Sequence, residues 1–546
     1  MKFGVMAWPS VGKLVVTACL ASVLSQVEAV DVTVSLNYST YIGTAQTGGT
    51  GVTEWLGIRY AAPPLGDLRF KRPQDPPVVS TPQPANQHGK YCLATNSPST
   101  DTDTSEDCLF LDVYAPSNAT RRSKLPVFLF IQGGGFNADS TPNQNGTGLI
   151  NASGNNIIVV NFNYRVGLYG FLTDGDKISP NNGLFDQRKV MEWVQTYITY
   201  FGGDPDHVVI GGASAGAASV SLHLAAYGGR DDGLFHAAAA ESVSFATVYT
   251  VEQSQWQFDN LAIRLGCVGT NPVSCLRNKT ATEIQDVNYN IPFPGSAAPP
   301  LYMYNPVIDG DFIRALTYTA FDEGKFVKVP VIFGDDTNGG TIFVYSNTST
   351  LAESNMFIKN QFPYITLKDL GTINELYPNP NDTCPGEGCY WRQASNVYGE
   401  QRYMCPGLYI SSKFTEYGVK GSYAYRWNVE DPAQIAEGLG VPHTSEQNAI
   451  FGPENTNGLA PASYYPGQEN AYAVTVIQGY WASFIRSYNP NTYRVPGSAK
   501  WEEWNDDTKP RLLFSTGGNT SIENVAGMSL ERRCNFWYSI GEDIRQ

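Results

Sequence analysis

A serine flanked by small residues is the first candidate for chemistry in this chain. Ser214 is the central residue of a Gly-Ala-Ser-Ala-Gly pentapeptide at 212–216, which follows the apolar segment 208–210 and precedes an alanine-rich stretch. This order predicts a strand, a sharp turn and a helix, the arrangement that lifts a serine hydroxyl clear of a packed core. We expect the glycines to be required because such a turn is crowded and its backbone strained. The motif predicts a nucleophile, although so short a pattern also occurs in ordinary turns.

A glycine triplet upstream supports the catalytic interpretation. Gly133 to Gly135 follow the apolar segment 125–131, which predicts a buried strand. Glycines after a strand expose backbone N–H groups, and such donors stabilise the oxyanion that forms when a hydroxyl attacks a carbonyl. We expect the N–H groups of Gly134, Gly135 and Ala215 to form this oxyanion hole. A flexible glycine loop is the alternative, and the serine motif downstream argues against it.

Further motifs occur in order over nearly the whole chain. They are Gly-Ile-Arg-Tyr-Ala-Ala-Pro-Pro at 57–64, Leu-Arg-Phe at 68–70, Glu-Asp-Cys-Leu-Phe-Leu-Asp-Val at 106–113, Asn-Tyr-Arg-Val-Gly at 163–167, Gly-Leu-Phe-Asp-Gln-Arg at 183–188, Phe-Gly-Gly-Asp-Pro at 201–205, Tyr480 with Trp481, Phe484, and Asn489 with Pro490. With the serine motif, this set resembles the type-B carboxylesterase/lipase family of α/β-hydrolases, which includes cholinesterases and secreted fungal lipases. The resemblance implies a serine carboxylesterase.

The alternation of apolar segments also predicts an α/β fold. Short apolar or β-branched segments predict strands, and apolar residues between 184 and 201 recur near helical spacing. We expect an α/β-hydrolase fold with a mostly parallel central sheet, helices on both faces and long insertions. Because 30–546 contains no linker, repeat or low-complexity tract, it is interpreted as a single domain. The predicted strands are 127–131, 157–162, 208–210, 237–240, 329–333 and 422–427.

The amino terminus predicts secretion. Residues 1–29 combine a lysine-bearing start, an apolar core at 14–24 and small residues before the expected cut, which is typical of a signal peptide. No later segment approaches the roughly 18 uninterrupted apolar residues of a membrane-spanning helix. The formal net charge of −15 argues against nucleic acid, whose phosphates need a basic surface. We expect a secreted, extracellular protein with no membrane anchor and no nucleic-acid partner.

Cysteines and glycosylation sequons agree with an oxidising secretory route. Loss of Cys19 with the signal peptide leaves eight cysteines, an even number. Short loops separate Cys92 from Cys108, Cys267 from Cys275, and Cys384 from Cys389, and the family resemblance implies a long-range bridge from Cys405 to Cys534. Asn-x-Ser/Thr sequons stand at Asn37, Asn118, Asn145, Asn151, Asn278, Asn347, Asn381 and Asn519.

Of the five histidines, His443 is the predicted base. A serine hydroxyl needs a base, and the segment around His443 resembles the catalytic histidine segment of the family. His207 directly precedes the nucleophile strand and His223 falls in the helix after it, so both are predicted to be structural or surface residues. His88 and His236 match no motif.

The acid of the expected triad departs from the family pattern. Family members place a glutamate in a Gly-x-x-x-x-Glu-Gly segment, and the corresponding position here is Gly339. Family members also often carry Gln-Ser-Gly after the next strand, where this chain has Glu241 followed by Ser242. We therefore predict that Glu241 orients His443, with Asp336 and then Asp335 as reserve candidates. A second-layer or surface role is the alternative for Glu241.

Substrate preference can be predicted from two further departures. Ala213 replaces the glutamate that the family commonly has before the serine, and the 92–108 loop contains no aromatic side chain for a choline group. The same loop is shorter than the lid loops of the fungal lipases. The chain is thus predicted to hydrolyse small or soluble uncharged esters without cofactor or metal. The alternatives are a lipase for longer acyl chains and a catalytically weakened binding or adhesion protein, and the sequence predicts no oligomeric state.

Overall fold

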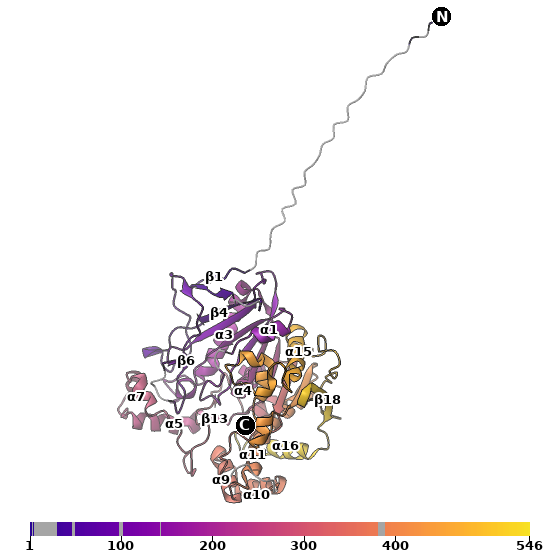
Figure 1. Cartoon of the computed structure of the whole chain (residues 1–546). Coiled ribbons are helices and arrows are strands. Elements are labelled where there is room, and N and C mark those ends of the chain that lie inside the picture. Colours follow the sequence, from indigo (N-terminus) through magenta and orange to yellow (C-terminus); the bar gives the residue numbers. More distant parts are fainter. Residues whose placement is uncertain (3, 5–29, 46–49, 98–101, 142–143, 381–387) are drawn as a thin grey trace.

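The structure is a computed structural model, and it describes the whole chain except residues 3, 5–29, 46–49, 98–101, 142–143 and 381–387. Most of the predicted signal peptide therefore lies outside the described residues. The centre of the molecule is an 11-stranded sheet (Figure 1). Its order is β18 (Asn519–Asn524), β17 (Pro510–Ser515), β16 (Ser422–Asn428), β15 (Val331–Asp336), β12 (Ala237–Glu241), β11 (Gly203–Ala213), β9 (Leu125–Ile131), β10 (Ile158–Phe162), β8 (Phe110–Pro116), β4 (Val52–Arg59) and β3 (Thr44–Ala45).

The middle of this sheet is parallel and its two edges are antiparallel. Every neighbouring pair from β10 across to β17 runs parallel. The pairs β10–β8, β8–β4, β4–β3 and β17–β18 run antiparallel. All six predicted strands lie in this sheet, so the predicted α/β-hydrolase fold is confirmed. Small sheets are formed by β1 (Thr33–Ser35), β2 (Thr40–Ile42) and β5 (Gln83–Pro84), by β6 (Tyr91–Cys92) and β7 (Thr104–Ser105), and by β13 (Tyr249–Thr250) and β14 (Val307–Ile308).

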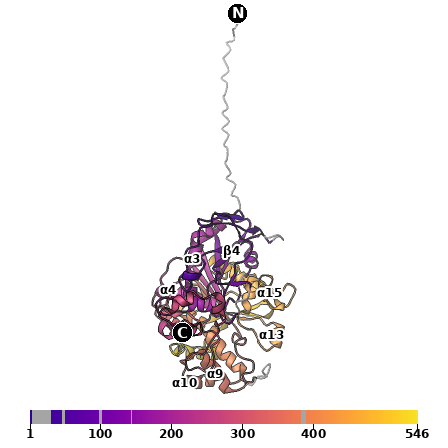
Figure 2. The ribbon, with the colours of Figure 1, turned by 90° about the vertical axis from the view of Figure 1, so that its left-hand side faces the viewer.

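Helices cover both faces of the sheet. The helices are α1 (Thr147–Ala152), α2 (Gly167–Phe171), α3 (Asn182–Tyr197), α4 (Ala215–Gly229), α5 (Val251–Arg264), α6 (Pro272–Arg277), α7 (Ala281–Gln285), α8 (Thr317–Asp322), α9 (Leu351–Gln361), α10 (Leu367–Leu376), α11 (Trp391–Gly399), α12 (Cys405–Glu416), α13 (Pro432–Ala436), α14 (Ser445–Phe451), α15 (Ala471–Ser487) and α16 (Ser529–Ser539). Figure 2 shows α3 and α4 on one side of the sheet and α15 on the other.

Side-chain alternation along the strands divides the core between these two faces. On β9, Val127, Leu129 and Ile131 pack into the cluster that includes α3 and α4. Phe128 and Phe130 pack into the opposite cluster with α14 and α15. Successive strand residues point to opposite faces, so an unbroken apolar run is what a sheet buried on both sides requires.

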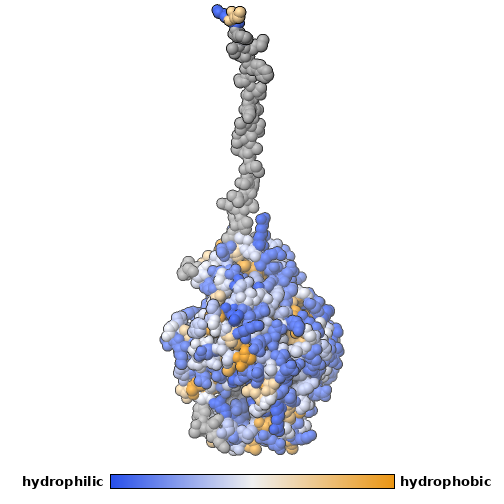
Figure 3. Space-filling model, turned by 90° about the vertical axis from the view of Figure 1, so that its right-hand side faces the viewer, coloured by the Kyte–Doolittle hydropathy of each residue, from blue (hydrophilic) through white to orange (hydrophobic). Residues whose placement is uncertain are grey.

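A third cluster packs around Trp391 and Trp537 and, among the described residues, reaches the sheet only at Ala424 of β16. It joins α9, α10, α11 and α16, which gather at one end of the molecule in Figure 1. The face in Figure 3 is mainly hydrophilic, with small and separate hydrophobic patches. Within the described residues, no helix has both the length and the apolar character needed to cross a bilayer.

Three of the four predicted disulfides are present. They join Cys92 to Cys108, Cys267 to Cys275 and Cys405 to Cys534. Cys389 is exposed, and its predicted partner, Cys384, lies outside the described residues. The Cys405–Cys534 bridge spans 129 residues and ties α12 to α16.

The predicted glycosylation sequons lie mostly on the surface, and Asn381 falls outside the described residues. Asn145 is half-buried, and its side-chain oxygen accepts a hydrogen bond from the N–H of Thr147 (2.8 Å). The exposed sequon asparagines are Asn37, Asn118, Asn151, Asn278, Asn347 and Asn519.

Candidate active site

Ser214 occupies a strained turn between β11 and α4. Its dihedrals are φ 59° and ψ −119°, a combination that L-residues rarely adopt and that costs about 1–3 kcal/mol. The flanking glycines are required for close approach, as expected from the crowding of such a turn. A Cβ on Gly216 would lie 1.9 Å from the carbonyl oxygen of Ile131, and one on Gly212 would lie 2.6 Å from the backbone of Gly216. No side chain fits at either position, and the serine itself carries the strained backbone.

The glycine loop after β9 lies against this turn. A Cβ added to Gly133 would lie 2.9 Å from the Cβ of Ser214. Gly134 and Gly135 have φ of 106° and 61°, so their peptide planes take orientations that most residues avoid. Asn137 braces the loop, since its side-chain amide donates to the carbonyl of Gly135 (2.7 Å). The backbone therefore places the loop that carries two of the predicted oxyanion donors against the turn of the predicted nucleophile.

His443 lies in the loop before α14, and its imidazole is held by aromatic rings. The ring centroid lies 3.9 Å from that of Tyr403 and 5.2 Å from that of Phe343. Neither ring nitrogen has a hydrogen-bond partner among the described residues. Burial, and to a smaller extent the positive charge of Arg402, lowers the pKa of His443 to about 3. The imidazole is therefore neutral at ordinary pH, which is the state that a general base requires.

The other four histidines have structural partners. His88 pairs with Asp112 (2.8 Å), and His236 accepts a hydrogen bond from the N–H of Val208 (3.2 Å). The ring of His207 bonds to the carbonyl oxygen of Ile485 (2.8 Å), and that of His223 bonds to the side chain of Gln187 (2.9 Å). His443 is the one histidine whose two ring nitrogens both lack a protein partner within the described chain.

Glu241 ends β12 and is fully buried. Its register partner is Ala213, the residue before the nucleophile, and its carbonyl accepts from the N–H of Ser214 (2.9 Å). Neither side-chain oxygen has a hydrogen-bond partner among the described residues, and no hydrogen bond joins it to His443. Burial, and then the negative charge of Glu446, raises the pKa of Glu241 well above its usual value. A protonated Glu241 has the size and neutrality of glutamine.

Asp336 lies closer to the histidine loop. Its Oδ2 accepts from the backbone N–H of Thr444, directly after His443 (2.7 Å), and from Ser242 Oγ (2.8 Å). The Ser242 hydroxyl also lies 3.4 Å from Glu446 Oε1, which accepts from Tyr425 (2.9 Å). Burial and the negative charge of Glu446 raise the pKa of Asp336 well above its usual value.

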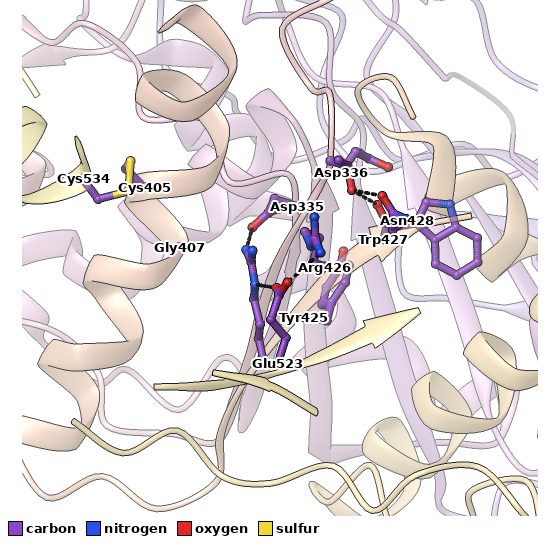
Figure 4. A network of polar contacts seen from close by, with 12 residues as sticks. Asp335, Asp336, Cys405, Gly407, Tyr425, Arg426, Trp427, Asn428, Glu523 and Cys534 are labelled. Carbon is purple, nitrogen blue, oxygen red and sulfur yellow. Dashed lines mark hydrogen bonds and ion pairs between the residues drawn. A yellow bond between two sulfur atoms is a disulfide. The ribbon is translucent and has the colours of Figure 1, made fainter. Parts of the chain in front are cut away.

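Asp335 and Gly339 take no part in this network. Asp335 points to the opposite face of β15, toward the cluster of Arg511, Arg426 and Glu523 (Figure 4). At Gly339, the first atom that an added Cβ would meet is Tyr403 Cδ2 at 3.6 Å, which is ordinary contact. The position that carries the acid in the family resemblance thus has room for a side chain and holds none.

The sequence analysis did not identify several residues of the site. Arg402 and Tyr403 belong to a π-helical turn, Glu400–Met404, between α11 and α12. Such turns are rare in proteins, and those that occur are often found at functional sites. No sequence pattern marks them reliably. Ser242 and Glu446 stand next to predicted residues, but only the folded chain shows that their side chains meet. In the described part of the chain, no cluster of three or more metal-binding side chains occurs.

Comparisons with known proteins agree with this geometry. A family model described as "Carboxylesterase family" matches residues 31–537. The chain is 30% identical to Secreted lipase 4 of Gibberella zeae, over 87% of this chain and 86% of that protein. It is also 30% identical to mouse (Mus musculus) cholinesterase, over 90% of this chain and 83% of that protein. Among solved structures, Aspergillus niger EstA superposes with a TM-score of 0.91 and 42% identity, covering 94% of this chain and 99% of that one.

Proposed function

The chain belongs to the carboxylesterase family and is a serine carboxylester hydrolase, and we propose that it acts outside the cell on small, soluble esters. The observation that carries the proposal is the strained Ser214 turn packed against the 133–135 glycine loop. Strain of this kind persists where the surrounding structure enforces it, and it is commonly part of a mechanism.

In the proposed reaction, Ser214 Oγ attacks the ester carbonyl and His443 accepts the hydroxyl proton. The N–H groups of Gly134, Gly135 and Ala215 stabilise the oxyanion, and His443 then returns the proton to the leaving alcohol. Water, deprotonated by the same imidazole, attacks the acyl-enzyme and releases the acid. Ser214 and His443 thereby return to their starting protonation states.

The site lacks a carboxylate bound to its base among the described residues, and we propose that Ser214 and His443 work largely as a dyad. Asp336 instead holds the loop through the N–H of Thr444. The role of Glu241 as the orienting acid stays a prediction, although its raised pKa favours a neutral side chain.

Small substrates are favoured by the loop that the Cys92–Cys108 bridge closes. This bridge spans only 16 residues, and β6 pairs with β7 inside it. We propose that so short and cross-linked a loop does not act as a lid at an oil surface. Secretion is supported by the disulfides and by the similarity to a secreted lipase.

A fluorophosphonate probe tests the proposal. An activated serine labels rapidly, so the protein should form one covalent adduct, mapped by mass spectrometry to the Ser214 peptide. Ser214→Ala should abolish both labelling and hydrolysis of 4-nitrophenyl butyrate while leaving the thermal unfolding transition in place. Rapid labelling elsewhere, or substantial turnover by the variant, would remove Ser214 from the mechanism. A folded protein that neither labels nor turns over ester would favour the binding role.

A further inference from the structure

A narrow cavity lies near the candidate active site, and two of its wall residues, Tyr302 and Arg402, connect it to that site. Many of its wall residues are aromatic. The cavity volume is about 20 Å³, which is enough for one small group. The residues that matter here are Tyr302, Gln361, Tyr398 and Arg402. The cavity is too small to hold more than a little water, so a charge inside it is poorly solvated.

Arg402 brings a positive charge into this cavity without a counter-ion. Its side chain is buried, with the residue only 4% exposed. Nε donates to Ser244 Oγ (2.9 Å), and within the described chain no other protein atom accepts a side-chain hydrogen bond from Arg402. No ion pair and no ring-face contact of Arg402 occurs among the described residues either. Both terminal nitrogens thus remain available to a ligand.

The other buried arginines behave differently. Each of them pairs with at least one carboxylate, as expected because a buried cation without a counter-ion is unfavourable by several kcal/mol. Arg402 is the exception among the buried arginines that the structure describes. The paired ones are Arg69 with Glu106, Arg165 with Asp186, Arg188 with Asp232, and Arg511 with Asp335 and Glu523.

The cavity is joined to the reacting groups through two contacts. Tyr302 packs on the oxyanion loop, since a Cβ added to Gly135 would lie 2.2 Å from its ring. Arg402 immediately precedes Tyr403, whose ring packs against the imidazole of His443 with their centroids 3.9 Å apart. A ligand group beside Arg402 would therefore lie close to an ester carbonyl held by the glycine loop.

We propose that Arg402 binds a carboxylate of the substrate, so that the preferred substrates are small esters carrying a carboxylate near the scissile bond. This inference rests on the proposed ester hydrolysis and replaces the expectation of an uncharged substrate. Guanidinium groups bind carboxylates through two parallel N–H···O bonds, and the two free nitrogens of Arg402 suit that geometry. The protein's net charge of −15 gives no general attraction for anions, so the selectivity is local.

Binding of the carboxylate also assists the base. The positive charge of Arg402 contributes to the low pKa of His443. A substrate carboxylate on Arg402 offsets that charge, so the imidazolium that forms during attack becomes less unfavourable. The substrate thereby supplies part of the negative charge that is missing at Gly339.

Matched substrates test the inference with the unmodified protein. The first pair is mono(4-nitrophenyl) glutarate against 4-nitrophenyl pentanoate, which places the carboxylate on the acyl side. The second pair is 4-acetoxybenzoate against 4-methylphenyl acetate, which places it on the alcohol side. In one pair, we expect kcat/KM for the anionic ester to exceed that of the neutral ester by about tenfold or more, as for a charge-assisted hydrogen-bonded pair. Neutral esters preferred in both pairs would overturn the inference and leave the proposed hydrolysis intact.

Substitution of Arg402 supplies the second test. Arg402→Gln should reduce kcat/KM for the favoured anionic ester by about 10- to 100-fold more than for its neutral partner, and Arg402→Lys should restore part of that ratio. The matched control is Arg533→Gln, which breaks the ion pair to Glu400 in the same π-helical turn but leaves the cavity cation in place. The control should keep the wild-type ratio. Equal losses on both esters in Arg402→Gln would assign Arg402 a structural role.

A pH profile and a milder variant keep the test decisive if Arg402→Gln does not fold. Ser244→Ala retains the charge and removes only the hydrogen bond that holds it, so the ratio should fall by a few-fold. In the wild type, the acid limb of kcat should lie at higher pH for the anionic ester than for the neutral one, because the carboxylate raises the pKa of His443. Superimposable limbs together with an unchanged ratio in Ser244→Ala would contradict the inference.

Discussion

Backbone contacts hold the nucleophile side of the candidate site, whereas ring packing holds the base side. Ser214 has strained dihedrals, and the backbone around it leaves no room for side chains. A Cβ on Gly216 would lie 1.9 Å from Ile131, and one on Gly212 would lie 2.6 Å from Gly216. His443 packs against Tyr403 and has no hydrogen bond to either ring nitrogen among the described residues. Main-chain geometry tolerates almost no substitution at Gly212 and Gly216, whereas an added Cβ at Gly339 meets only ordinary contacts.

The largest expected effect comes from breaking the nucleophile side. Gly216→Ala places a Cβ 1.9 Å from the carbonyl oxygen of Ile131, so the turn and the strand end must separate. We expect kcat/KM to fall by at least about 10²-fold, because a displaced oxyanion donor alone costs about that much. The control is Gly371→Ala in α10, where an added Cβ meets nothing within 4 Å. Activity near wild type in Gly216→Ala would show that the turn is not rigid.

On the base side, two acids can be ranked. Asp336→Asn disturbs the carboxylate that holds the N–H of Thr444, and we expect a loss of about 10- to 100-fold in kcat. Glu241→Gln keeps the shape of a buried side chain that forms no hydrogen bond to His443, and we expect less than about a threefold change. Steady-state kinetics with 4-nitrophenyl butyrate measures both. The reverse ranking, with Glu241→Gln losing about 10³-fold or more, would restore Glu241 as the orienting acid.

Adding a carboxylate at Gly339 tests whether the base side of the site is limited by the absence of an orienting acid. Gly339→Glu introduces a carboxylate where the first contact of the new Cβ is 3.6 Å from Tyr403, so the backbone need not move. We expect kcat for neutral esters to rise by about tenfold, a fraction of the effect of such an acid in an optimised triad. Gly339→Gln is the matched control, since it adds similar volume without charge. Equal changes in the two variants would attribute the effect to packing.

The smallest expected effect is a displaced pH limb. The neutral imidazole is the active form, and its pKa is lowered to about 3, so it stays neutral well below the usual histidine range. For a neutral ester, kcat/KM should remain nearly constant from about pH 8 to pH 5 and fall only at lower pH. An acid limb centred near the ordinary imidazole value of about 6.5 would show that His443 is more solvated or paired than this structure describes.

The sequence was sufficient to predict the fold and the crowded turn at Ser214, because both are encoded locally. An unbroken apolar segment such as 127–131 indicates a strand that is buried on both faces of a sheet. The glycines around Ser214 indicate positions where no side chain fits. Three disulfides were also predictable, since two close short loops and the third follows a family pattern.

The base side was harder to predict because its contacts join distant segments. Tyr403 and Arg402 come from a π-helical turn that carries no sequence signature. The Glu241 hypothesis treated a carboxylate at a strand end as an ionised acid. Whether such a group ionises depends on its surroundings, here full burial and the negative charge of Glu446.

Four of the fourteen described non-glycine residues with positive φ belong to this site, namely Phe136, Ser214, Ser242 and Thr444. Each such residue lowers folding stability by about 1–3 kcal/mol, which the remainder of the molecule offsets. Selection for heat resistance alone would therefore favour glycine at these positions, because glycine relieves the strain. Without an assay of ester hydrolysis, such a selection would enrich variants that are more stable but inactive. Thermal tolerance in this molecule is best increased on the distant helix α10 (Leu367–Leu376), which contributes no residue to the candidate site or to the Arg402 cavity.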